Sequence, residues 1–168
     1  MVTTVSNYLT EALDRLVLME KEALVDAGYH PDAYPYFFAW NAGFPYFTNR
    51  VDEDVNTGAT EGATQEWEEH VHTVRVRLVI AHITEGVPGT PEGLLYVYMP
   101  LVTNFFVNHP LLQSAAEPTP MDILSPEGMT VERPTGLRIF TNAGFKSNQV
   151  GCEWPLRLPF IIPIEREY

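Results

Sequence analysis

The chain is predicted to fold as one α+β domain, a mainly antiparallel sheet of about four strands with two main helices on one face. Three observations lead to this class. An amphipathic helical pattern opens the chain, strand patterns that alternate apolar and polar residues follow it, and a second helical pattern lies between the strands. One core accounts for the whole length, residues 1–168.

The first helix is predicted over residues 4–27. Apolar residues recur there at helical spacing, and Glu20 is the only polar residue within that stripe. Gly28 supplies the left-handed residue with which many helices end, and Pro31 prevents the helix from continuing.

An aromatic strand and a long acidic loop are expected next. The strand is Tyr34–Trp40, and the aromatic residues around it exceed what its own core needs, so some are expected at an interface. Residues 48–69 contain glycines and threonines and no apolar period, which indicates a loop. Apart from Arg50, its charged residues are all acids: Asp52, Glu53, Asp54, Glu61, Glu66, Glu68 and Glu69.

The clearest strand is predicted over residues 70–83. One set of alternate positions is apolar in its middle, from Val74 to Ile80, and is expected to face the core. The other set carries Arg75 and Arg77, which are expected to point away from the core.

The second half of the chain is predicted to contain one helix and a final pair of strands. The helix covers residues 91–108, and a proline-rich excursion with one short strand follows at 113–135. The strands cover residues 137–142 and 149–164. Three prolines at every fourth position share one parity of the last strand, so it is expected to pair fully on one side only, as an edge strand. These prolines are Pro155, Pro159 and Pro163.

Composition excludes several classes of function. With 22 acids and 10 bases, the formal net charge is −12, which argues against a protein that grips nucleic acid phosphates or an anionic membrane surface. The first residues do not have the pattern of a signal peptide, and no stretch reaches the length of a membrane span. Cys152 is the only cysteine, so no disulfide can form within the chain.

No catalytic, metal or cofactor site is predicted, and the protein is not expected to be an enzyme. His70, His72 and His82 lie too far apart along one strand to share an ion. Cys152 is expected to be a small buried hydrophobe. The acids of residues 52–69 are expected to form a charged loop or an interface; a weak site for a divalent ion and a pair of catalytic carboxylates are the alternatives.

The charged residues instead suggest an interface. Four arginines on strands are expected to form a basic strip on one sheet face, paired with acids of the same chain, docked by the acidic loop of a neighbouring subunit, or both. The candidate interface residues are Asp52, Glu53, Asp54, Glu61, Arg75, Arg77, Arg138 and Arg157.

The order of these elements, with PYFFAW after the first helix and a long strand of alternating V-x-V-x-L-x-I type, resembles the tail terminator proteins of long-tailed bacteriophages. The resemblance implies a homohexameric ring in the virion, assembled in the host cytoplasm. Such a ring caps the tail tube, meets the tail tube protein and the head-side connector protein, and lets DNA pass without specific binding. Another neck, connector or tail-completion protein and a small acidic binding module are the alternatives.

Overall fold

The computed structural model describes residues 7–37, 43–56, 67–82, 90–140 and 148–163. These residues form two α-helices, α1 (Tyr8–Glu22) and α2 (Thr90–Asn108), and a short 3-10 helix, η1 (Val25–Ala27). The α+β class and the two main helices are confirmed. The described residues contain six strands and not the four expected: β1 (Asp32–Tyr34), β2 (Tyr46–Asn56), β3 (Trp67–His82), β4 (Thr130–Val131), β5 (Arg138–Phe140) and β6 (Gln149–Pro163).

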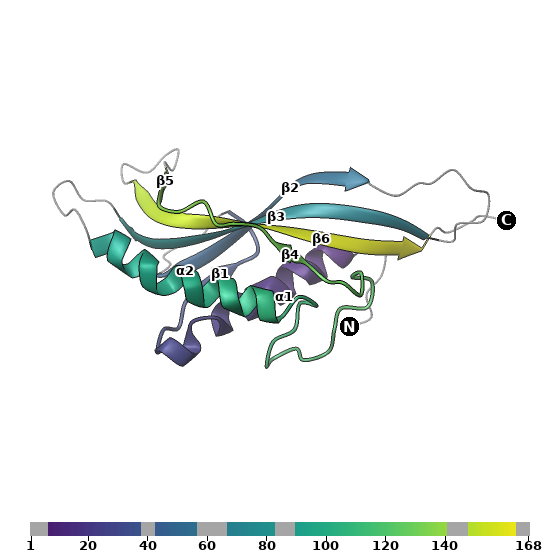
Figure 1. The fold of residues 1–168 in the computed structure, drawn as a ribbon, viewed down its shortest axis with the longest axis horizontal. Coiled ribbons are helices and arrows are strands. Elements are labelled where there is room, and N and C mark those ends of the chain that lie inside the picture. The colour runs from purple at the N-terminus through teal and green to yellow at the C-terminus, as the bar shows by residue number, and fades with distance from the viewer. Residues whose placement is uncertain (1–6, 38–42, 57–66, 83–89, 141–147, 164–168) are drawn as a thin grey trace.

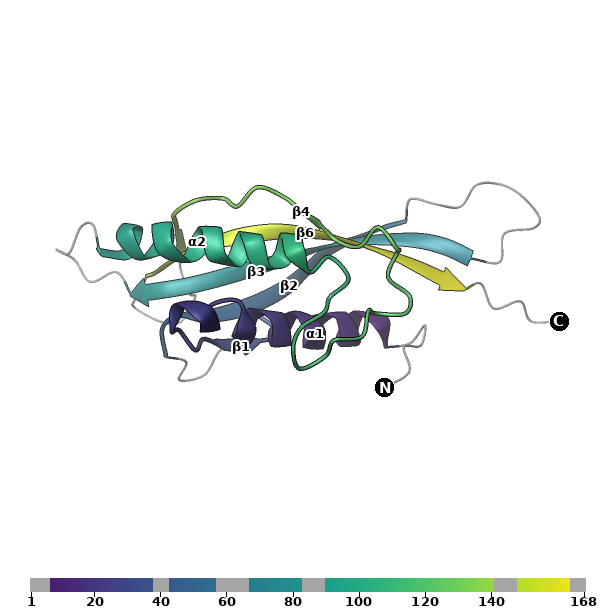
Figure 2. The same cartoon turned by 60° about the horizontal axis from the view of Figure 1, so that its bottom comes forward.

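All six strands belong to one sheet, in the order β1-β2-β3-β6-β4, with β5 also paired to β6. The β1–β2 pair is parallel and the others are antiparallel, so the sheet is mixed. Both helices lie on the same face of the sheet (Figure 1) and run side by side along it (Figure 2). Within the described part of the chain, the opposite face is therefore not covered by a helix.

The predicted acidic loop at 48–69 is wrong at both of its ends. Residues 48–56 continue β2, and β3 already begins at Trp67, while the section between them lies outside the described residues. The strand was not apparent in the sequence because Asn49 occupies an inward position between Phe47 and Val51 and breaks the apolar alternation. Asn49 is accommodated because its amide donates to Glu20 and to the carbonyl oxygen of Tyr34, each at 3.0 Å.

The predicted strand Tyr34–Trp40 is also wrong over residues 35–37, because β1 ends at Tyr34, and residues 38–40 lie outside the described residues. The three residues of β1 pair with the start of β2, from Tyr46 to Thr48. Pro35 follows directly and has no N–H with which to extend the ladder. The first helix is likewise shorter than predicted and is followed by η1, and Gly28 takes the expected left-handed conformation at φ 84°.

The core lies between the helices and the inward positions of β3 and β6, as their alternation predicted. Val74, Val76 and Leu78 of β3 are fully buried, and so are the four inward residues of β6 from Trp154 to Phe160. The Trp154 indole donates to the hydroxyl of Thr103 in α2 at 2.8 Å, so even its polar atom is satisfied.

The prolines of β6 act as predicted, but the strand is not at the edge of the sheet. Its whole length pairs with β3, while β4 and β5 pair with short sections of its other side. The carbonyl oxygens of Pro155 and Pro159 accept hydrogen bonds from Glu132 and Ser125 on that second side. Because N–H and C=O of one strand residue point the same way, the missing N–H groups also lie on that side, away from β3.

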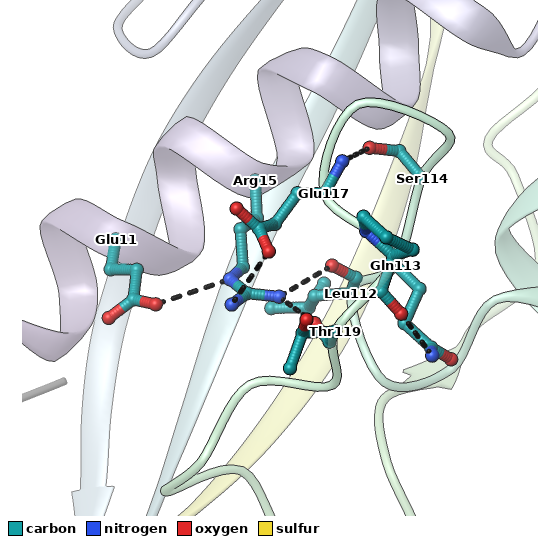
Figure 3. A network of polar contacts seen from close by, with 8 residues as sticks. Glu11, Arg15, Leu112, Gln113, Ser114, Glu117 and Thr119 are labelled. Atoms are coloured by element: carbon teal, nitrogen blue, oxygen red, sulfur yellow. Dashed lines mark hydrogen bonds and ion pairs between the residues drawn. The ribbon is translucent and has the colours of Figure 1, made fainter. Parts of the chain in front are cut away.

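Arg15 of α1 fastens the proline-rich excursion to the helices. Its guanidinium donates to the carbonyl oxygens of Leu112 and Thr119 and to the carboxylate of Glu11 (Figure 3). The side chain is buried, so these bonds form in a medium that strengthens them. The excursion is thereby held against α1 although it contains little regular structure.

Replacing Arg15 with methionine is expected to loosen residues 112–121 without unfolding the domain. The substitution keeps most of the apolar stem and removes hydrogen bonds to a charged donor, each of which contributes about 1.5–3 kcal/mol. Hydrogen–deuterium exchange should become about tenfold faster or more in this segment. Lys21→Met, on an exposed position of the same helix, is the matched control. Unchanged protection in Arg15→Met would contradict the role of this side chain.

Candidate functional site

The face of the sheet opposite the helices carries most of the charged strand residues. Alternate positions of β2, β3 and β6 point to this face, and residues paired across strands share it. Arg75 lies opposite Arg50 and Pro155, while Arg77 lies opposite Thr48 and Glu153.

The centre of this face is hollowed, with a volume of about 610 Å³. We call it the arginine hollow, because three guanidinium groups surround it. Its lining combines three arginines, two acids, one threonine and one aromatic ring: Phe37, Arg50, Asp52, Thr73, Arg75, Arg77 and Glu153.

Asp52 is the acid that two of these arginines share. The β2–β3 register shifts between Val51 and Asp54, so Asp52 lies in a bulge, where strands commonly redirect a side chain. Its carboxylate accepts a hydrogen bond from Arg75 and lies 3.6 Å from Nε of Arg50. The hydrogen bond and charge of Asp52 raise the pKa of Arg75, so this arginine stays charged at any ordinary pH.

Arg77 is held in a different way, between two aromatic rings. Its guanidinium carbon lies 4.1 Å from the ring centre of Phe37 and 3.9 Å from that of Phe140. One terminal nitrogen lies 3.6 Å from Glu153, whereas the buried Nε has no hydrogen-bond partner among the described residues. Burial lowers the pKa of Arg77, and the Glu153 charge opposes that change.

A small apolar cluster borders the hollow on the same face. Tyr46, Val79 and Phe140 are buried together, with Tyr34 packed against them. The Tyr46 hydroxyl donates to Gln149 at 2.9 Å, and burial of the ring raises the pKa of Tyr46. Because Phe140 belongs to this cluster, the cluster holds in place one of the two rings between which Arg77 lies.

The structure brings together part of the predicted interface. Asp52, Arg75 and Arg77 line the hollow, and their pairing with acids of the same chain is present. Arg138 and Arg157 lie exposed on the same face, opposite Gly151 and Thr73, but outside the hollow as lined by the described residues. The backbone of Glu53 and Asp54 belongs to β2 while their side chains, and the whole of Glu61, lie outside the described residues.

Sequence reasoning missed four residues that line the hollow, Phe37, Arg50, Thr73 and Glu153, and it missed Phe140, whose ring packs on Arg77. Phe37 belongs to the aromatic surplus noted around residues 34–47, which was a signal for an interface but not for a particular position. Glu153 is the one acid among the apolar residues of β6, and its parity was the available signal for it.

Contacts within the fold surround His70, His72 and Cys152. His72 is buried, with its Nε2 2.8 Å from the Tyr8 hydroxyl, and His70 lies 3.0 Å from Glu68. Cys152 is fully buried as predicted, and burial raises the pKa of its thiol, which disfavours the reactive thiolate. Neither α1 nor α2 combines the length and the apolar character needed to cross a membrane, within the part of the chain that is described.

Comparison with known proteins adds no assignment: no protein-family model matches the chain, and no curated protein matches it significantly. The described surface offers paired charges on a rigid sheet, with aromatic rings beside them, which is an arrangement suited to contact with another macromolecule.

Proposed function

We propose that this protein is a tail terminator of a long-tailed phage, a structural virion protein that forms a ring on the end of the tail tube. The observation that carries the proposal is the sheet face without helices, where charged groups are held in fixed positions around the arginine hollow. A rigid charge pattern gives a contact its register and its specificity. The second support is the sequence, because PYFFAW after the first helix and the long strand of V-x-V-x-L-x-I type resemble that family.

Exposed apolar side chains supply further contact surface. In α2, Tyr96 and Val107 are 63% and 56% exposed, and on β5 Ile139 is 60% exposed. Different patches on one subunit permit head-to-tail contacts, which close into a ring when the rotation between subunits fits. The ring would meet the tail tube protein on one side and the head-side connector on the other.

The acidic balance of the chain suits the passage of DNA. A net charge of −12 per subunit repels phosphates, so DNA would move through the ring without adhering to it. A neck or connector protein of the same assembly is the second candidate, supported by the same surfaces; a small acidic binding module is the third.

The purified protein is expected to form rings of one size. Native mass spectrometry should give a single oligomer, expected to be a hexamer, and negative-stain images should show rings with a central hole. Added to polymerising tail tube protein, the rings should sit at tube ends and stop growth. A protein that remains monomeric at all concentrations, with and without tube protein, would overturn the proposal; rings that bind a connector but not tubes would favour the neck protein.

A further inference from the structure

The arginine hollow has more positive than negative charge, although the chain as a whole is strongly acidic. Arg50, Arg75 and Arg77 bring three guanidinium groups, and Asp52 and Glu153 bring two carboxylates. Asp52 is shared between Arg50 and Arg75, so neither arginine has a carboxylate of its own among the residues that line the hollow. One further carboxylate would balance the charge of the hollow.

Arg50 and Arg77 are also placed where they can bind a further carboxylate. Arg77 is clamped between Phe37 and Phe140 and retains a side-chain exposure of 25%, so part of its guanidinium reaches the hollow. A group fixed before binding loses little conformational entropy when a ligand arrives. Arg50 is 61% exposed at the rim and can turn toward an incoming charge.

The chemistry favours a carboxylate over a nucleic acid phosphate. Two acids already face the hollow, and a polyanion that followed it would meet them as well as the acidic remainder of the molecule. A single carboxylate needs only the space between the arginines and can be bound by two parallel hydrogen bonds from one guanidinium.

An acidic segment that meets these requirements lies at the start of β3. Glu68 and Glu69 follow Trp67, whose side chain is 44% exposed. This end of the sheet extends past both helices, at the right of Figure 1. An exposed indole next to two acids matches a hollow that combines arginines with an aromatic ring.

We propose that the arginine hollow of one subunit binds the acidic start of β3, Trp67–Glu69, of a second copy. This inference rests on the proposed function, because the partner, a second copy of the chain, is the one that a ring requires. The carboxylate of Glu69, which lies on the same face of β3 as Trp67, supplies the missing negative charge between Arg50 and Arg77, and Trp67 packs beside Phe37. The donor and the acceptor are different surfaces, so the contact is head-to-tail.

Two variants remove the acceptor and one removes the donor. Arg77→Met removes the guanidinium that lies between the rings and keeps an apolar side chain beside them. Arg50→Glu reverses an exposed charge, so it tests the hollow even if Arg77→Met fails to fold. Glu68→Lys with Glu69→Lys reverses the donor. Each is expected to weaken self-association, measured by sedimentation velocity, by about tenfold or more, as loss of a charge-assisted bond does. Arg133→Met, at an exposed arginine outside the hollow, is the control.

Mixing the two kinds of variant provides a stricter measurement. Arg50→Glu mixed with the double lysine variant should associate more tightly than either variant alone, because the reversed charges match. If self-association is unchanged in every variant, the inference about the hollow is overturned, whereas the proposed ring is not.

A fluorescent peptide with the sequence of residues 60–70 tests the hollow apart from the ring. It is expected to bind wild-type protein and to bind Arg77→Met and Arg50→Glu about tenfold more weakly. Peptide binding by a protein that never forms rings would overturn the proposed function and support the hollow as an acidic-peptide site. Displacement of the peptide by a short DNA duplex at physiological salt would overturn the choice of a carboxylate in favour of a phosphate.

Discussion

Replacing Gly151 with alanine is expected to destabilise the fold by more than about 3 kcal/mol, or to prevent folding. Gly151 lies in β6, opposite Val79 of β3. A Cβ atom at this position would overlap the carbonyl oxygen of Leu78 and lie 3.1 Å from Cα of Val79. Both contacts are with backbone in the middle of the sheet, so a side-chain rotation cannot relieve them.

The neighbouring bulge explains why the strands approach so closely. The β3–β6 register shifts between Val79 and Ala81, and glycine inside a strand often permits such an approach. An alanine would force β3 and β6 apart at the pair Val79–Gly151. These are the two strands whose inward residues form the core. A loss of about 3 kcal/mol is a large part of the roughly 5–15 kcal/mol by which a typical domain is stable.

Thermal and urea unfolding measure this effect, with Gly43→Ala as the matched control. Gly43 is exposed, a methyl group added there would have no described atom within 4 Å beyond the neighbouring residues, and its backbone is not left-handed. The control should unfold within about 0.5 kcal/mol of the wild type. A Gly151→Ala protein as stable as the control would contradict the close approach of the two strands.

The fold could be predicted from the sequence where a strand had one apolar face. In β3 and β6, alternation placed the core residues and the outward arginines correctly, because nothing polar interrupts their inward positions except at the ends. In β2, Asn49 does interrupt them, and its partners Glu20 and Tyr34 belong to other elements. A local pattern carries no information about such a distant partner, so the sequence of this strand resembles that of a loop.

The arginine hollow illustrates the same limit. Alternation put Arg75 and Arg77 on one face, but the rings that enclose Arg77 come from Phe37 and Phe140, which are far apart in the sequence. Which acid lies opposite which arginine is decided by register between strands, and a single sequence does not show register. Asp52, Arg75 and Arg77 could therefore be proposed as interface residues from the sequence, but their partners in the hollow could not.

Glu20 gives the second large effect, a gain in stability when its charge is removed. The side chain is fully buried in α1, and its carboxyl accepts one hydrogen bond from Asn49 at 3.0 Å. The other oxygen has no partner among the described residues. Burial raises the pKa of Glu20 well above its usual value, and the Asn49 hydrogen bond opposes that change only in part.

The direction of the pH dependence follows from this raised pKa. In the unfolded chain Glu20 ionises near the ordinary glutamate pKa of 4.5, whereas in the folded protein it keeps its proton to a higher pH. The native state therefore binds more protons between these two pKa values, and stability is lost as pH rises through that interval, by up to about 1.4 kcal/mol per pH unit. Below the unfolded pKa the loss is absent.

Glu20→Gln is expected to remove this loss because the amide never ionises. At pH 8 the variant should melt several degrees above the wild type, since about 1 kcal/mol corresponds to roughly 2–4 °C in a domain of this size. At pH 4 the two proteins should melt together. Asp14→Asn, which removes an exposed charge from the same helix, should not change the slope of stability against pH. Parallel pH profiles for wild type and Glu20→Gln would show that Glu20 is ionised in the native protein, with Asn49 and its surroundings supplying more compensation than the single hydrogen bond indicates.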